Sequence, residues 1–502
     1  MTTGEAAPRQ QRTYGNWRRP ERGGIGRLSL GATLLLLGGM IAVVLGMLVS
    51  VVVALVLGVL LLIALAPLAV KDRHGRTLLM RTVARAAWRR QVRTGAHLYR
   101  SGPLSHIGHG TCTLPGLAAS STVSEHRDAY GLPFAMITYP DSNHYVVALN
   151  CDADGASLVD QDQVDTWVAH WGTWLASLAT EPGLVGATVT VEAAPDSGLR
   201  LQHEVRGNTA PDAPALAMQM LEEVLHEYPA GSAQITTRIA LTYSGAAHAG
   251  HDRRGPEEMA VLLGHRLPGL TSGLAMTGAG AARAMTAMQL AEAVRIAYDP
   301  SVGTLVEEAH GHPGGSGLTW DQAGPAAAQE AWDHYRHDSA VSVTWVMAEA
   351  PRGEVLPSVL TGLLAPSEHV ARKRVTLAYR PHDPAAAARL VERDRKDAVF
   401  RAGQSPLGRA RDDVAVRAAE QTATEEASGA GVTRFGLYVT ATVASAGELP
   451  RAEAAIDNLS APARIALRKA AGSQAAAFAA CLPIGLVIPL HLTLPTAFRD
   501  NL

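Results

Sequence analysis

Histidines are the residues of this 502-residue sequence whose spacing most readily suggests chemistry. Four pairs could each offer two imidazoles to a metal ion: His106/His109, His248/His251, His310/His312 and His334/His337. A zinc site uses three or four protein ligands, and no obvious third ligand stands near any pair, although the fold could supply a distant one. Their polar, loop-like or exposed helical contexts favour surface histidines. We therefore expect no metal site and no cofactor.

The cysteines give little support to a catalytic or structural thiol site. Cys112, Cys151 and Cys481 are widely spaced and form no CxxC pair, which argues against a disulfide framework or a cysteine zinc site. A reducing compartment is the simpler interpretation. Cys112 could pair with His109 or His126 as a nucleophile and base, but nothing in the sequence orients them. No catalytic residue is nominated.

Motifs for nucleotide and hydrolase chemistry are missing from the sequence. No Gly-Lys dipeptide occurs, so the phosphate-binding lysine of a Walker A loop is absent. The sequence also lacks HExxH, GxSxG and GxGxxG, and the glycine-rich stretch at 311–317 has no lysine. These absences exclude a P-loop motor and leave no recognisable enzyme motif.

An apolar run from residue 28 to residue 70 contains no Asp, Glu, Lys or Arg. About 20 helical residues cross a hydrocarbon core, so this run fits two crossings. It is too long for a signal peptide, whose apolar stretch has about 7 to 15 residues. We expect a helical hairpin that bends among Gly46, Ser50 and neighbouring small residues. The glycines that would let the two backbones approach closely are Gly31, Gly38, Gly39, Gly46 and Gly58.

The charges beside this run predict its orientation. Residues 1–27 carry +4 and residues 71–100 carry +8, so both flanks are expected to be cytoplasmic, at the bacterial plasma membrane. Because the whole chain carries −2, residues 101–502 carry about −14. An acidic region of this kind should not bind nucleic acid non-specifically.

Residues 76–93 predict an amphipathic helix next to the membrane. Leu79, Val83, Ala86 and Trp88 could share one side, with arginines on the other, as in an interfacial helix on anionic lipid. The arginines could equally serve only to fix topology. We expect exposed residues near the membrane to dock a partner or anchor in lipid; the candidates are Tyr14, Trp17, Arg18, Arg19, Arg89 and Arg90.

The remaining sequence predicts an α+β fold. Strand-like and helical segments alternate in a first module at 101–245 and a second at 340–502, separated by a helical and loop-rich insert or bridging region at 246–339. The expected architecture is a set of two-layer, ferredoxin-like (split βαβ) modules. Tryptophans at helical spacing between 161 and 178 favour packing on a sheet over ligand binding. A single long charged helix is expected from about 384 to 426.

Two parts of the sequence resemble known proteins. YGNWRRP (14–20), followed by the membrane hairpin, resembles an actinobacterial family found beside conjugative type IV secretion genes, with a PrgI-like hairpin and a long soluble region. VTLAYRPHDP (375–384), the charged helix and AFAACLPIG (477–485) resemble the N-terminal, non-motor region of conjugative secretion ATPases. The chain ends where the motor would begin. The resemblance implies a non-enzymatic scaffold or adaptor that docks a separate ATPase at the membrane, and it transfers no catalytic residue.

Two alternatives remain open. The E component of the type VII secretion core complex also combines two N-terminal membrane helices with a cytosolic α/β region. A membrane-tethered enzyme that uses scattered histidines or cysteines is the contender from another functional class.

Overall fold

The computed structural model describes residues 12–17, 30–70, 72, 76–102, 105, 110–155, 158–210, 212–227, 233–247, 252–351, 353–403 and 410–492. Within them the chain combines helices with one large antiparallel sheet, and two apolar helices precede the sheet. The mixed α and β character predicted from the sequence is confirmed. The ferredoxin-like modules are not confirmed, because the strands join into a single sheet.

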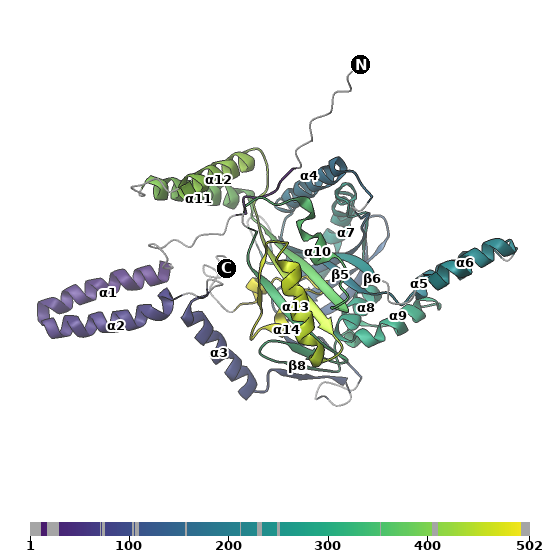
Figure 1. Cartoon of the computed structure of the whole chain (residues 1–502), viewed down its shortest axis with the longest axis horizontal. Helices are drawn as coiled ribbons and strands as arrows, with labels where there is room; N and C mark the ends of the chain where they lie inside the picture. Colours follow the sequence, from purple (N-terminus) through teal and green to yellow (C-terminus); the bar gives the residue numbers. More distant parts are fainter. Residues whose placement is uncertain are drawn as a thin grey trace, which may run out of the picture.

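The apolar run forms the expected hairpin, which projects from the rest of the molecule (Figure 1). Helices α1 (Leu30–Val49) and α2 (Val51–Ala69) are long and apolar enough to cross a membrane. Ser50 makes the turn and caps α2 by accepting a hydrogen bond from the Val52 amide. A Cβ at Gly39 would collide with Leu61, and one at Gly46 would lie 2.8 Å from Leu57. These two glycines face the partner helix, whereas Gly38 and Gly58 face open space.

Thirteen strands of the described chain form the sheet, in the order β1-β8-β9-β10-β12-β11-β5-β6-β4-β3-β2. Two short strands lie off this path, β7 on β4 and β13 on β10. Every pairing is antiparallel. The strands are β1 (Leu98–Arg100), β2 (Thr122–Arg127), β3 (Pro133–Tyr139), β4 (His144–Asp152), β5 (Leu184–Pro195), β6 (Ala233–Ser244), β7 (Ala281–Ala284), β8 (Ala327–Glu330), β9 (Tyr335–His337), β10 (Ala340–Glu349), β11 (Arg372–Pro381), β12 (Thr433–Val443) and β13 (Ala466–Lys469).

From β2 onward, and apart from α9 (Gly303–His310) after α8, the α-helices and strands form two halves with the same order of elements. The first half runs β2-β3-β4-α4-β5-α5-α6-β6-α7-β7-α8, and the second runs β8-β9-β10-α10-β11-α11-α12-β12-α13-β13-α14. Corresponding strands also pair alike: β4 with β3, β6 and β7, and β10 with β9, β12 and β13. The helices are α4 (Gln161–Leu178), α5 (Leu199–Asn208), α6 (Ala215–Glu227), α7 (Pro256–Ser272), α8 (Ala287–Tyr298), α10 (Thr361–Leu364), α11 (Pro384–Gly403), α12 (Ala410–Ala427), α13 (Leu449–Ser460) and α14 (Gln474–Ala479). The sheet is therefore a structural duplication.

The two halves join through β5 and β11, which we call the seam. Seven residue pairs align there, from Lys373 opposite Ala193 to Tyr379 opposite Ala187. This pairing makes one continuous sheet from residues about 180 positions apart in the chain. The region 246–339, expected to be an insert or a bridging region, contains α7, β7, α8 and α9 followed by β8 and β9.

Hydrophobic cores cover both faces of the sheet. Along β4, Val146 and Ala148 enter one core, while Tyr145 and Val147 enter another, as the two-residue period of a strand requires. Helices α8 and α14 cover the first face together. Helices α4 and α7 cover the opposite face of the first half, and α10 and α13 that of the second.

Two helical predictions can be checked against this arrangement. The tryptophan stripe of α4 packs in the core as predicted, because Trp174 is buried there and stacks on Trp171 at 4.9 Å. The single long helix expected from 384 to 426 was wrong. The chain forms α11 and α12, which pack against each other. Gly403 is the last residue of α11, and Pro406 and Gly408 stand between the two helices in sequence; neither residue type readily continues a helix.

Candidate membrane-proximal site

Residues 12–17, which we call the N-terminal arm, lie against the sheet region (Figure 1). The Tyr14 amide donates to the Val355 carbonyl and the Val355 amide donates to the Tyr14 carbonyl, each at 2.8 Å. The Tyr14 hydroxyl also donates to Asp165 of α4 at 3.4 Å. The arm precedes the apolar hairpin in the sequence, and Val355 follows it. This bridge therefore joins the chain before the hairpin to the chain after it.

Side chains of the arm add contacts to the second half of the sheet. Asn16 donates from Nδ2 to the Ala418 carbonyl at 3.1 Å and to the Thr422 hydroxyl at 3.0 Å, both on α12. Its φ of 63° is left-handed, a conformation that asparagine tolerates better than most residues. Trp17 packs edge-on against Phe435 of β12, with ring centroids 6.5 Å apart. The arm is thus held by backbone, amide and aromatic contacts.

These contacts correct the expectation that the aromatic residues of the arm are exposed. Tyr14 and Trp17 are half-buried against their own chain. The neighbouring arginines had suggested an aromatic and basic belt at the membrane. The expectation failed because local sequence does not reveal contacts with residues hundreds of positions away. Arg18 and Arg19 lie outside the described residues. Docking of lipid or a partner by these four residues stays a prediction.

Helix α3 (Leu78–Arg93) follows the hairpin and attaches it to the sheet from the other side. Gln91 donates to Glu330 of β8 at 2.6 Å. Trp88 packs edge-on against Trp332, with ring centroids 6.0 Å apart, so it faces the sheet region. It does not share the side of Val83, contrary to expectation. Val83 is 59% exposed, and Leu79, Arg89 and Arg90 are also exposed. The helix therefore presents both apolar and basic side chains to its surroundings.

Deleting residues 1–17 should expose the backbone of the segment that the arm covers. The Val355 amide then loses its acceptor, and we expect it to exchange hydrogen at least about tenfold faster, since such protection reports local opening. Hydrogen exchange of peptides spanning 353–357 measures this change. Peptides from β3, remote from the arm, serve as the control. Unchanged exchange at 353–357 would mean that the arm does not dock.

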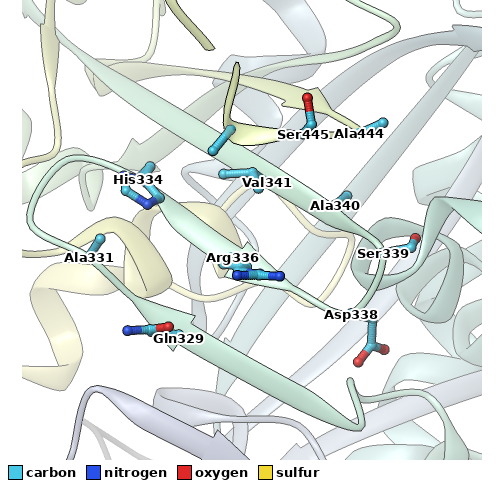
Figure 2. Close-up of a pocket in the computed structure, with 11 residues that line it drawn as sticks. Gln329, Ala331, His334, Arg336, Asp338, Ser339, Ala340, Val341, Ala444 and Ser445 are labelled. Atoms are coloured by element: carbon cyan, nitrogen blue, oxygen red, sulfur yellow. The ribbon is translucent and has the colours of Figure 1, made fainter. Parts of the chain in front are cut away.

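A surface hollow of about 480 Å³ lies beside the turn between β9 and β10 (Figure 2). Residues from β8, the β9–β10 hairpin and the end of β12 line it: Gln329, Ala331, His334, Arg336, Asp338, Ser339, Ala340, Val341, Ala444, Ser445 and Ala446. Figure 2 shows His334 and Asp338 at opposite ends of the hairpin, with Arg336 between them.

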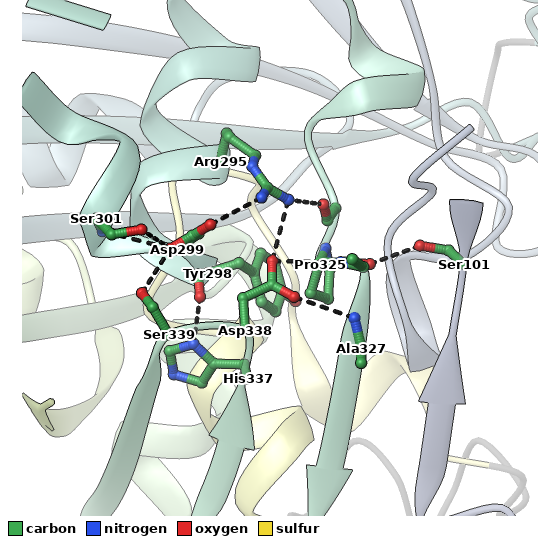
Figure 3. Close-up of polar contacts among 12 residues, drawn as sticks. Ser101, Arg295, Tyr298, Asp299, Ser301, Pro325, Ala327, His337, Asp338 and Ser339 are labelled. Atoms are coloured by element: carbon green, nitrogen blue, oxygen red, sulfur yellow. Dashed lines mark hydrogen bonds and ion pairs between the residues drawn. The ribbon is translucent and has the colours of Figure 1, made fainter. Parts of the chain in front are cut away.

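A network of hydrogen bonds and ion pairs behind this hollow connects α8 with the β9–β10 turn (Figure 3). Arg295 bonds Asp299 at 2.9 Å, Asp338 at 3.1 Å and the Gly324 carbonyl at 2.6 Å. Asp338 also accepts from the Ala327 amide at 3.0 Å, and burial raises the pKa of its carboxyl. These charged groups hold α8 to the β9–β10 turn and are engaged with each other, so they are poorly placed to act on a substrate.

The histidines and cysteines do not assemble into a metal centre in the described part of the chain, where no group of three or more His, Cys, Asp or Glu could hold an ion. His310 bonds Glu292 at 2.9 Å instead. Cys151 and Cys481 are buried, and burial raises the pKa of both thiols, that of Cys151 to about 12. Protonated thiols are poor nucleophiles. The pairs His106/His109 and His248/His251 lie outside the described residues.

His337 is buried and neutral within the network (Figure 3). Its Nδ1 lies against the Tyr298 carbonyl, which can only accept, so Nδ1 carries the proton and Nε2 accepts from the Ser342 hydroxyl at 2.8 Å. Burial, together with the charge of Arg374, lowers the pKa of His337 to about 4.

This depressed pKa predicts a pH-dependent stability. Below its unfolded pKa of about 6.5, the unfolded chain binds a proton that the folded chain does not. The contribution of His337 is therefore complete above pH 6.5 and decreases as pH falls toward 4. The loss should reach about 3 kcal/mol. Urea unfolding of wild type and His337→Gln across this interval measures it. If the free energy of unfolding depends on pH equally in the two proteins, the depressed pKa is not that of His337.

Comparison with known proteins adds one finding. A family model described as a domain of unknown function (DUF8461) matches residues 21–80, which include α1, α2 and the first residues of α3. A search of curated proteins finds no match. The similarity thus covers the hairpin and its flanks, and the sheet region lies beyond it.

Proposed function

We propose that this chain is a membrane-anchored, non-catalytic scaffold subunit of a bacterial secretion machine. The observation that carries the proposal is the bridge between Tyr14 and Val355. The arm before the hairpin and the sheet after it can pair only when both lie on the same side of the membrane. Two crossings by α1 and α2 satisfy that requirement. The basic flanks favour the cytoplasmic side of the plasma membrane for both termini and the sheet region.

Attachment at both ends of the hairpin suits a scaffold. The arm fixes the chain before α1, and α3 fixes it after α2 through Gln91 and Trp88. A sheet region held at two points has a restricted orientation relative to the bilayer, which is useful for presenting a surface to a partner. Arg89 and Arg90 of α3 are exposed, which supports the proposal that they contact anionic headgroups.

The proposed partner is a separate secretion ATPase, together with other membrane subunits of a conjugative type IV system. Support for this choice comes from the sequence resemblances at 14–20, 375–384 and 477–485. No direct contact with nucleic acid is proposed, because the region after residue 100 is acidic.

Affinity purification tests the proposal. The tagged full-length chain is purified from its native cells in mild detergent, and bound proteins are identified by mass spectrometry. An untagged strain is the background control. Recovery of a conjugative-type ATPase supports the proposal, and recovery of type VII components would assign the chain to that system instead. A preparation without any secretion component would overturn the scaffold proposal and favour the tethered enzyme.

A further inference from the structure

Three arginines converge on one glutamate next to the seam. Glu192 of β5 bonds Arg372 and Arg374 of β11 at 2.7 and 3.0 Å and Arg238 of β6 at 3.0 Å. Burial alone would raise the pKa of Glu192, but the guanidinium groups, Arg372 foremost, outweigh it and hold this pKa well below its usual range. The carboxylate is therefore charged at neutral pH, as guanidinium groups in proteins are. We call these four groups the seam cluster; its net charge is +2.

The seam cluster leaves hydrogen-bond donors without acceptors. Nε of Arg238, Nε of Arg372 and Nη1 of Arg374 are buried and make no hydrogen bond. Arg374 is 2% exposed, and its other nitrogens already bond Glu192 and the Ala297 carbonyl at the end of α8. Buried polar groups are nearly always hydrogen-bonded, so three orphan donors in one cluster need an explanation.

The excess positive charge also lacks a counter-charge. In the described part of the chain, Glu192 is the only carboxylate that bonds any of the three arginines. A buried charge is stable only when it is compensated, and the one carboxylate that all three arginines share neutralises only one of the three positive charges. The cluster reaches solvent on one side, where Arg238 and Arg372 are 16% and 14% exposed. A charged ligand could therefore approach from that side.

We propose that Arg238, Arg372 and Arg374 form a binding site for a phosphate-type oxyanion at the seam. Glu192 holds the three guanidinium groups together, and the anion supplies the missing acceptors and negative charge. Guanidinium is suited to this chemistry because its fork of N–H groups matches the oxygens of a phosphate. The ligand would bridge β6 and β11, which belong to different halves of the sheet, and so would reinforce the seam.

The test uses the full-length protein in detergent and inorganic phosphate as the probe. Isothermal titration is performed with phosphate against a chloride background of matched ionic strength. We expect saturable binding to wild type and a higher unfolding temperature in phosphate than in chloride, because a ligand that binds only the folded state stabilises it. Wild type that neither binds phosphate nor responds to it would overturn the proposal.

Variants locate the binding to the cluster. Arg372→Gln and Arg238→Gln each remove one partly exposed guanidinium and should weaken phosphate binding at least tenfold. Arg283→Gln, which removes a guanidinium from an exposed pair with Asp152, is the matched control and should bind like wild type. If one of the two cluster variants fails to fold, phosphate binding is compared between wild type and the other variant. Binding that is the same in wild type and a folded cluster variant would place phosphate elsewhere and contradict the site.

Discussion

Replacing Glu192 with glutamine should destabilise the sheet region by about 3–5 kcal/mol, the usual effect of removing one partner of a buried ion pair. The carboxylate is the shared acceptor of Arg238, Arg372 and Arg374, and its loss leaves three guanidinium groups without that partner. Urea unfolding at pH 7 in phosphate-free buffer measures the difference. The effect should appear in both halves of the sheet, since Glu192 connects β5 with β6 and β11.

A matched control separates burial from charge. Asp152→Asn breaks a pair with Arg283 in which both side chains are more than half exposed, so we expect a change within about 1 kcal/mol. Equal effects of the two variants would mean that the seam cluster does not stabilise the sheet. Acid adds a second check. Because the folded pKa of Glu192 is depressed, its contribution is present above the unfolded value of about 4.3 and is lost only below it.

Placing one arginine in the middle of each apolar helix should prevent stable membrane insertion. Ile41 of α1 and Leu60 of α2 are 62% and 55% exposed on the hairpin, so their side chains would face lipid. Each arginine near a helix centre costs roughly 2.5–3.5 kcal/mol of insertion free energy, and the pair about twice that. We expect Ile41→Arg with Leu60→Arg to leave the membrane fraction on alkaline extraction.

The matched control keeps the same positions apolar. Ile41→Leu with Leu60→Ile should remain in the membrane fraction as wild type does. A double-arginine variant that resists extraction would mean that α1 and α2 do not hold the chain in the bilayer. That result would remove the basis of the scaffold proposal.

The hairpin was predictable from sequence because its cause is local. An apolar run of this length without charges has few stable arrangements in water, and Ser50 and the glycines at 39 and 46 mark the turn and the helix contact. The tryptophan stripe of α4 was predictable for the same reason, since helical spacing shows which side is buried.

The single sheet and its duplication were not predictable in this way. The seam pairs strands about 180 residues apart, and no short-range pattern specifies such a partner. Alternation along β5 would place Thr188, Thr190 and Glu192 on a solvent-facing side, yet all three are buried. Polar side chains on that face bond across strands, as Thr190 does with Thr376 at 2.9 Å. Burial there follows from the covering helices and not from the strand sequence.

The membrane-proximal residues show the same limit. Arginines at 89 and 90 were correctly expected to be exposed, because charged side chains on a helix usually are. Tyr14 and Trp17 were wrongly expected to be exposed, because the residues that they contact lie far away in the sequence, at 355 and 435. A short segment with aromatic residues looks the same in sequence whether it meets lipid or its own fold.

Sidedness of the two regions that the arm connects tests the central claim most directly. Single cysteines replace Arg12, Ser50 or Tyr130 in a chain whose native cysteines are alanine, and a membrane-impermeant maleimide is applied to right-side-out and inverted vesicles. The cysteines of Arg12→Cys and Tyr130→Cys should react from the same, cytoplasmic side. The cysteine of Ser50→Cys should react from the opposite side. Labelling of the cysteines at 12 and 130 from opposite sides would contradict a two-pass hairpin joined to the sheet at both ends. Labelling of the cysteine at 50 from the same side as those two would contradict it as well.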